Sequence, residues 1–260
     1  MIPPSVRSRE PEVDSTPSAE YGQVGGSSTR RPSRWARLLT FRASHADFKG
    51  LDTGDLALGL LATWIVGMGR YWDDPGAVLL QHLGVGSVVY VFVLAFFLWL
   101  VIWPLGPANW SYVRVLTFVG LVAPPAVLYA IPIERLTTLR VAQTVNVWFL
   151  AIVAAWRVAL LLFFLRRSAA LTYPRLIVGS LLPMTLIVNA LTVLNLERAV
   201  FEIMGGLRQA GTAADSAYGV LVAITVIADL ALVPVLLAYL VLVSFALRER
   251  REARQAARHA

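Results

Sequence analysis

Residues 84–103 read GVGSVVYVFVLAFFLWLVIW, a run of twenty residues without a single charged side chain. No Asp, Glu, Lys or Arg occurs anywhere between Pro75 and Val113, and the apolar residues lack the polar gaps of an amphipathic helix. About 20 such residues are enough to cross the ~30 Å hydrocarbon core of a bilayer. Residues 84–103 therefore predict a transmembrane helix.

The rest of the chain has a similar character. It is 57% hydrophobic and only 15% charged, whereas a soluble domain carries roughly 25% charged residues. We therefore expect an all-α integral membrane protein, with a six-transmembrane-helix bundle in residues 47–247. Its spans are expected at about 54–72, 84–103, 115–133, 143–165, 176–196 and 218–245. The first is the weakest, because it is short and is framed by Asp55 and Arg70.

The two ends of the chain are basic. Residues 1–46 are rich in Pro, Ser, Gly and charge, which predicts a disordered cytoplasmic tail. Within it, residues 34–46 mix arginines with aromatic and aliphatic side chains. This pattern suits an amphipathic helix in the membrane interface, with its arginines on anionic head groups, and an unstructured tail is an equal alternative. Residues 248–260 form a second basic cytoplasmic tail.

Lysine and arginine are distributed unevenly between the two sides of the predicted bundle. With the N-terminus in the cytoplasm, the cytoplasmic segments hold 17 of these residues and the external segments hold 5. Cytoplasmic loops of membrane proteins carry such an excess of positive charge. The bias predicts an N-in, C-in arrangement, and we expect a multi-pass protein of a cell membrane, namely the inner membrane of a bacterium.

The sequence lacks the residues that several kinds of functional site require. The chain has no cysteine and only three histidines, so neither a thiolate site nor a multi-histidine metal site is expected. No nucleotide-binding, hydrolase or metalloprotease motif is present, and we expect no cofactor. The net charge of +7 is concentrated at the two ends, where it favours membrane lipids over nucleic acid as the partner.

Two charged residues lie inside predicted spans, Arg157 in the fourth and Asp229 in the sixth. Burying such a charge in lipid is costly unless it is paired or hydrated. Counted from Val145 and Tyr218 at ~1.5 Å per residue, the two charges lie at depths of about 18 Å and about 16 Å. If Tyr218 marks the outer end of its span, the depths match, and we predict an ion pair between them.

Neutral polar residues follow one helical face in each of the last three spans. They are spaced by three, four or eleven residues from one another or from the charged pair, and they comprise Asn146, Thr185, Asn189, Thr192 and Thr225. Such a stripe has two interpretations. It fixes helix packing through interhelical hydrogen bonds, each worth ~0.6 kcal/mol, or it lines a polar pathway or a substrate cavity.

A polar cluster is expected at the outer interface between the first two spans. Its residues are Arg70, Asp73, Asp74 and His82. Asp74 followed by Pro75 predicts a helix start, and the apolar residues after it predict a short helix along the interface. Helix capping and ion pairing with Arg70 explain these residues, and a weak metal or proton site is the alternative.

Pro124 and Pro125 stand in the middle of the third predicted span. Neither supplies a backbone N–H, so the helix is predicted to kink or unwind there. Broken helices mark binding sites in many transporters, but proline is also common in membrane helices generally. The small residues at 84–87 predict close contact between helices rather than phosphate binding.

No residue motif assigns the chain to a family. We expect a non-enzymatic integral membrane protein, either a small transporter or channel-like component or a scaffold for partner proteins. Protein partners would be other proteins or further copies of the chain. The rival hypothesis is a membrane-embedded enzyme that acts on a lipid or lipid-linked substrate, with Asp73, Asp74 and His82 at the outer surface.

Overall fold

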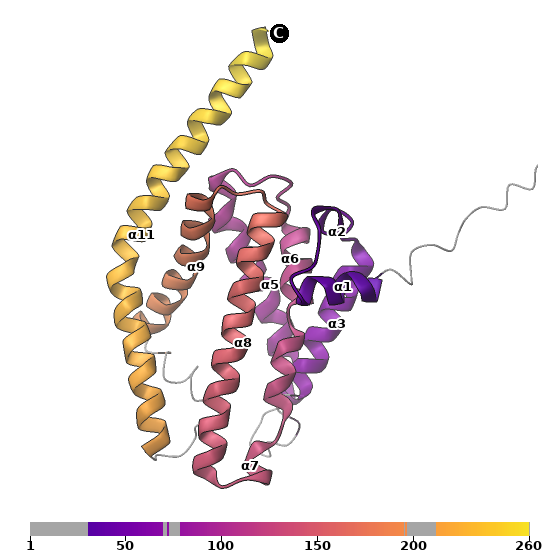
Figure 1. The fold of residues 1–260 in the computed structure, drawn as a ribbon, viewed down its shortest axis with the longest axis vertical. Coiled ribbons are helices and arrows are strands. Elements are labelled where there is room, and N and C mark those ends of the chain that lie inside the picture. Colours follow the sequence, from indigo (N-terminus) through magenta and orange to yellow (C-terminus); the bar gives the residue numbers. More distant parts are fainter. Residues whose placement is uncertain (1–30, 70–71, 73–78, 195, 197–211, 260) are drawn as a thin grey trace, which may run out of the picture.

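The computed structural model describes residues 31–69, 72, 79–194, 196 and 212–259, and every regular element within these ranges is a helix (Figure 1). The predicted tail at 1–30 lies outside them. In chain order the elements are α1 (Arg31–Leu39), α2 (His45–Lys49), α3 (Thr53–Gly69), α4 (Leu79–His82), α5 (Val85–Ile102), η1 (Trp103–Leu105), α6 (Tyr112–Leu121), η2 (Pro124–Ala130), α7 (Ile133–Leu136), α8 (Leu139–Arg167), α9 (Tyr173–Val193) and α11 (Thr212–His259).

Four helices of the described chain are long and apolar enough to cross a membrane. Their apolar segments are Val85–Leu105, Thr144–Arg167, Tyr173–Val193 and Val222–Arg258. These coincide with the second, fourth, fifth and sixth predicted spans, which are therefore confirmed as long apolar helices. The chain has the composition and helix lengths of a membrane-embedded protein.

The other two predicted spans are not regular long helices. The third is divided into α6 and η2, which meet at a bend of 40° and count together as a fifth candidate span. The first is α3, whose 17 residues extend about 26 Å at ~1.5 Å per residue, less than a ~30 Å hydrocarbon core. By length and composition, the described chain thus has four to five helices or bent helix pairs that could span a membrane.

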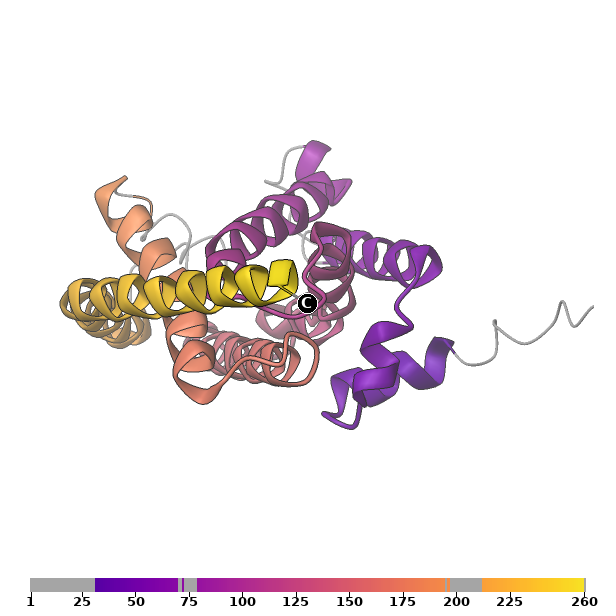
Figure 2. The ribbon, with the colours of Figure 1, turned by 90° about the horizontal axis from the view of Figure 1, so that it is seen from above.

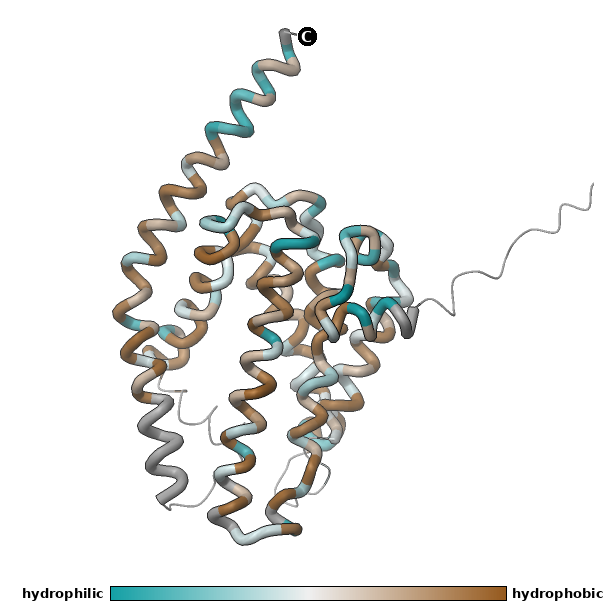
Figure 3. The backbone as a smooth tube through the Cα atoms, in the orientation of Figure 1, coloured by the Kyte–Doolittle hydropathy of each residue, from teal (hydrophilic) through white to brown (hydrophobic). Residues whose placement is uncertain are grey.

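The long helices lie side by side, and α11 extends well beyond the others (Figure 1). α1 and α2 do not join the bundle as parallel members but lie against its flank beside α3 (Figures 1 and 2). Apolar residues dominate the long helices, whereas hydrophilic residues gather on α1, on α2 and on the last turns of α11 (Figure 3).

The helix expected within 34–46 is present in part. α1 ends at Leu39, the chain turns through Phe41 with a φ of 60°, and α2 begins at His45. Phe48 of α2 is 1% exposed, so this short segment is docked on the bundle.

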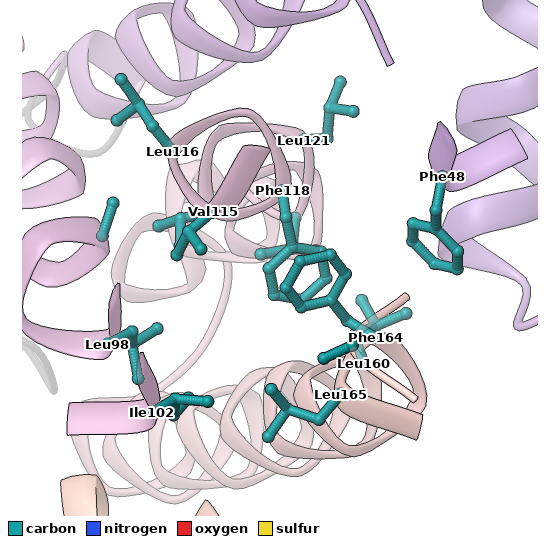
Figure 4. Close-up of a cluster of buried hydrophobic side chains, with 14 of the residues drawn as sticks. Phe48, Leu98, Ile102, Val115, Leu116, Phe118, Leu121, Leu160, Phe164 and Leu165 are labelled. Carbon is teal, nitrogen blue, oxygen red and sulfur yellow. The ribbon is translucent and has the colours of Figure 1, made fainter. Parts of the chain in front are cut away.

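An aromatic cluster at the centre of the core explains why α2 docks there (Figure 4). Phe118 of α6 and Phe164 of α8 stack with their ring centroids 4.1 Å apart and their planes at 5°. The ring of Phe48 approaches Phe164 at 5.5 Å in an edge-to-face arrangement. Burial of an aromatic ring contributes strongly to core stability, so α2 belongs to the core.

α3 packs through small residues. Its buried side chains are Asp55, Gly59, Thr63 and Gly67, one in every four along the helix. A Cβ atom added to Gly59 would lie 2.9 Å from the backbone nitrogen of Leu121, so α3 and α6 are in backbone contact. Small residues allow membrane helices to approach this closely.

The close helix contact predicted at 84–87 is confirmed at its first residue. Gly84 has a φ of 64°, which favours glycine, and a Cβ atom there would lie 2.8 Å from the backbone nitrogen of Met68 on α3. Gly86 differs, because a Cβ atom added to it would meet nothing within 4 Å.

Candidate functional site

Pro124 and Pro125 interrupt the third span as predicted. A helical carbonyl normally accepts from the N–H four residues later, so the two prolines deprive the carbonyls of Gly120 and Leu121 of their usual donors. α6 ends at Leu121, and η2 begins at Pro124 after the 40° bend. The break therefore creates two backbone oxygens that need other donors.

Both oxygens accept a hydrogen bond from another group of the protein. The indole Nε1 of Trp35 on α1 donates to the Leu121 carbonyl at 2.8 Å. The Gly120 carbonyl accepts from the backbone N–H of Ala123 at 3.1 Å. The Thr63 hydroxyl lies 3.5 Å from the same carbonyl, but its single hydrogen is nearer the Gly59 carbonyl, at an O···O distance of 2.9 Å. Lipid offers no donors, so irregular backbone at membrane depth must be satisfied by protein or water. Here the protein satisfies it.

The helix that carries Trp35 is fixed by an ion pair. Nη1 of Arg34 lies 2.7 Å from Oδ2 of Asp55, which is 2% exposed, and the same nitrogen donates to the carbonyl of Gly50. The carboxylate also accepts from the backbone N–H of Asp52 at 3.1 Å. A buried carboxylate needs such compensation. We call this set the N-terminal clasp, and it consists of Arg34, Trp35, Asp55, Thr63 and Leu121.

Arg37, on the same helix, also binds a carboxylate of this chain. Its Nη2 lies 2.5 Å from Oδ1 of Asp47, and Ser44 completes a capping box with Asp47 at the start of α2. Burial acts to raise the pKa of Asp47, but hydrogen bonds from Arg37 and Ser44 outweigh it and hold that pKa below its ordinary value of 3.8. Arg34 and Arg37 thus bind acidic side chains, whereas the amphipathic-helix hypothesis expects them on lipid head groups.

The predicted ion pair between Arg157 and Asp229 is not formed in the part of the chain that the structure describes. Arg157 of α8 is half-buried, but Asp229 of α11 is exposed. The preceding residue, Ala228, is 6% exposed and faces the bundle. Successive helical residues are turned by about 100°, so Asp229 lies on an outer flank. Equal depth in the membrane did not imply a shared face.

The polar residues of α9 bond within their own helix. Thr185, Asn189 and Thr192 each donate to a backbone carbonyl three or four residues earlier, at 2.9 to 3.0 Å. Bonded in this way, each side chain uses an acceptor within its own helix rather than on a neighbouring one. Asn146 on α8 and Thr225 on α11 are half-buried.

Most of the predicted outer cluster lies beyond the described residues. This applies to Arg70, Asp73 and Asp74, so their convergence with His82 stays a prediction. His82 is half-buried and ends α4, which is described over Leu79–His82. Within the described ranges, no group of three His, Asp or Glu side chains could hold a metal ion.

α11 packs along α9 and is joined to the rest of the bundle by a few polar contacts. Nη2 of Arg175 on α9 lies 2.7 and 2.8 Å from the two carboxylate oxygens of Glu249, and the hydroxyl of Tyr239 donates to a backbone carbonyl of α5 at 2.9 Å. Of the α11 side chains whose burial is described, only Ala228 and Ala246 are buried. Most of this helix is therefore open to lipid or to another protein.

Comparisons of the chain with protein-family models, with curated proteins and with solved structures find no match. The function therefore has to be argued from the geometry of the chain itself.

The N-terminal clasp is not predicted from the sequence. One readable signal was the fourfold spacing of Asp55, Gly59, Thr63 and Gly67, which is typical of a helix that packs through small residues. The bond made by Trp35 leaves no such signal, because it joins residues 86 positions apart and because interfacial tryptophans ordinarily face the lipid head groups.

Proposed function

We propose that this chain is a non-enzymatic, multi-pass membrane protein that acts as a scaffold, and that α11 is the helix it offers to a partner. In this proposal α3 and the α6–η2 unit cross the membrane together with the four long helices, which gives six spans. The excess of lysine and arginine on one side supports an N-in, C-in arrangement in the inner membrane of a bacterium.

One observation carries the proposal, which is the exposure of Asp229 on an apolar flank of α11. Its neighbours Val226, Leu230 and Val233 are 50%, 74% and 63% exposed. An aspartate at the centre of a membrane helix costs ~2.5–3.5 kcal/mol on insertion, and such residues almost always face protein or water. A partner packed on this flank would shield the carboxyl group from lipid.

A transporter is less well supported. It requires polar groups that face a common path, but the α9 residues Thr185, Asn189 and Thr192 bond to their own backbone. The carbonyls at the broken helix would be natural ligands for a transported ion, yet they already accept hydrogen bonds from the protein. These contacts suit a static framework.

Oxygen accessibility along α11 tests whether this flank is covered. The chain has no cysteine, so single cysteines can carry spin labels without interference. Val226→Cys and Val233→Cys report on the flank of Asp229, and Ile227→Cys and Val241→Cys report on exposed positions turned away from it.

The protein is extracted with its surrounding lipid by an amphipathic polymer, so that partners stay bound. The first two labels are expected to be less accessible to dissolved oxygen than the other two. Equal access at all four positions would contradict the scaffold role of α11.

A further inference from the structure

Building on the proposed role of α11, we infer that its partner is a second copy of this chain. The two α11 helices pack in parallel, and the two Asp229 carboxyl groups are hydrogen-bonded to each other across the contact.

A seven-residue repeat runs along the flank that carries Asp229. Its members are spaced alternately by four and three residues, and we call them the Asp229 stripe: Val222, Val226, Asp229, Val233, Leu236, Leu240, Val243 and Leu247. All are exposed except Val243, which is half-buried. This spacing allows two helices to pack knobs into holes along a shared seam.

The Asp229 stripe matches a copy of itself. Two copies inserted by the same signals have the same orientation in the bilayer, so their α11 helices run parallel and each residue faces its own counterpart. Valine and leucine fill both sets of layers along the stripe, so its aliphatic side chains can pack against the same side chains of the second copy.

The Asp229 layer supplies its own donor and acceptor. When two carboxyl groups share one proton, the protonated group donates a hydrogen bond to the other, and neither needs a partner from lipid. Every other residue of the stripe is aliphatic. A shifted register would therefore place both carboxyl groups against hydrocarbon, so this single polar layer fixes the register of the pair.

The remainder of α11 permits this contact. Ala228 and Ala246 face the bundle from a flank about 100° away from the stripe. Val243 also packs against the core of its own copy, so packing within one copy and packing between copies use different faces only from Val222 to Leu240. Beyond Leu247 the same spacing reaches Arg250 and Arg254. Nη2 of Arg250 donates to the Trp103 carbonyl of its own copy at 3.2 Å, so the contact between copies ends before this residue.

Disulfide formation tests the contact, because it requires Cα atoms within about 7 Å of each other. The full chain is purified with one added cysteine and placed in lipid vesicles. Oxidation of Val226→Cys, Val233→Cys or Leu240→Cys is expected to give a species of twice the 28.5 kDa chain mass. Ile227→Cys and Val241→Cys are the matched controls, and they are expected not to form this species.

The role of the carboxyl group is tested by energy transfer between labelled copies diluted with lipid. Asp229→Leu is expected to weaken association by roughly fivefold to thirtyfold, whereas Asp229→Asn retains it because two amides can bond to each other. Asp229 makes no hydrogen bond or ion pair with any other described residue, so each copy keeps its fold. An unchanged melting temperature checks this.

Each outcome has one meaning. Equal disulfide yield on and off the stripe, or association unchanged by Asp229→Leu, overturns the inference. Labels protected from oxygen in native lipid, without a species of doubled mass, mean that a different protein covers α11, so the inference fails and the scaffold role stands. Equal oxygen access on both flanks contradicts both.

Discussion

The indole of Trp35 takes the place of the N–H that Pro125 lacks. In an unbroken helix the Leu121 carbonyl would accept from residue 125, and here it accepts from Trp35 at 2.8 Å. Tryptophan suits this role because it offers one donor on an otherwise apolar ring, so the bond is completed without bringing a charge toward the break.

Trp35→Phe is expected to destabilise the detergent-solubilised protein by about 1–3 kcal/mol, because it leaves the Leu121 carbonyl without a donor. The measurement is thermal unfolding followed by circular dichroism. Trp148→Phe is the matched control, since Trp148 is 65% exposed and is expected to change the melting temperature little. Equal losses in the two variants would show that the indole bond does not stabilise the break.

The ion pair of the clasp should behave as a coupled unit. Arg34→Leu leaves the buried Asp55 carboxylate without its partner, which is expected to cost about 3–5 kcal/mol. Asp55→Leu should cost less, because Arg34 is 19% exposed and still donates to the Gly50 carbonyl, and the double variant should recover much of the loss caused by Arg34→Leu. Arg37→Leu breaks a pair whose arginine is 45% exposed and should cost below about 1 kcal/mol. The measurement is the melting temperature of the four variants. If the stability losses of Arg34→Leu and Asp55→Leu add up in the double variant, the two side chains are not coupled.

Among the elements, α3 shows how a short apolar helix is held without large buried side chains. Its contact with α6 is made by backbone atoms, and the hydroxyl of Thr63 donates to the carbonyl of Gly59 at 2.9 Å within the same helix. Close backbone approach adds many small dispersion contacts, which are a main source of helix association in lipid.

Gly59→Ala is therefore expected to destabilise the protein by about 1–3 kcal/mol, because the added Cβ atom would lie 2.9 Å from the backbone nitrogen of Leu121 and the helices must separate. Gly86→Ala is the control within a helix. Its Cβ atom meets open space, and alanine favours the helix by up to ~1 kcal/mol, so stability should stay the same or rise. The measurement is thermal unfolding in detergent. Equal melting temperatures for the two variants would contradict the close contact between α3 and α6.

The break between α6 and η2 offers a sharper test. Pro125→Ala restores an N–H that can bond to the Leu121 carbonyl, so alone it should leave stability unchanged or improved. In that background Trp35→Phe should cost less than in the natural chain, because the carbonyl has a second donor. A double-mutant cycle of melting temperatures measures the difference, and an unchanged cost for Trp35→Phe would show that the two donors do not substitute for each other.

At the scale of the whole molecule, sequence patterns located the long helices but not their rotation. A predominantly apolar run of about 20 residues has few other stable outcomes, so the four long apolar helices that could cross a membrane were predictable by length. The rotation of a helix is set by contacts with its neighbours, and a helix that is apolar all round gives no periodic signal for it. The Arg157–Asp229 pair failed for this reason, because depth can be counted along a chain and facing cannot.

The break in the third predicted span was also predictable from the sequence. Pro124 and Pro125 act on their own backbone, so their local effect, the break, follows from residue type alone. The replacement donor for the Leu121 carbonyl, the Trp35 indole, comes from α1, 86 positions away in sequence, whereas the Ala123 N–H that serves Gly120 is local. The sequence therefore predicts the break in the helix, and only the folded chain shows which groups donate to the freed carbonyls.

The last prediction concerns how the whole chain crosses the membrane. α3 is the shortest of the proposed spans, so the topology depends on whether its 17 residues cross the bilayer. If they do, reporters fused at the N-terminus and after Ala260 should both signal the cytoplasm, while one inserted between Gln209 and Ala210, ahead of α11, should signal the outside. Opposite signals at the two termini would mean that α3, or the α6–η2 unit, does not span. Breaking the Arg34–Asp55 ion pair with the substitution Arg34→Leu should leave these signals unchanged. Orientation follows the distribution of all the arginines and lysines rather than a single residue.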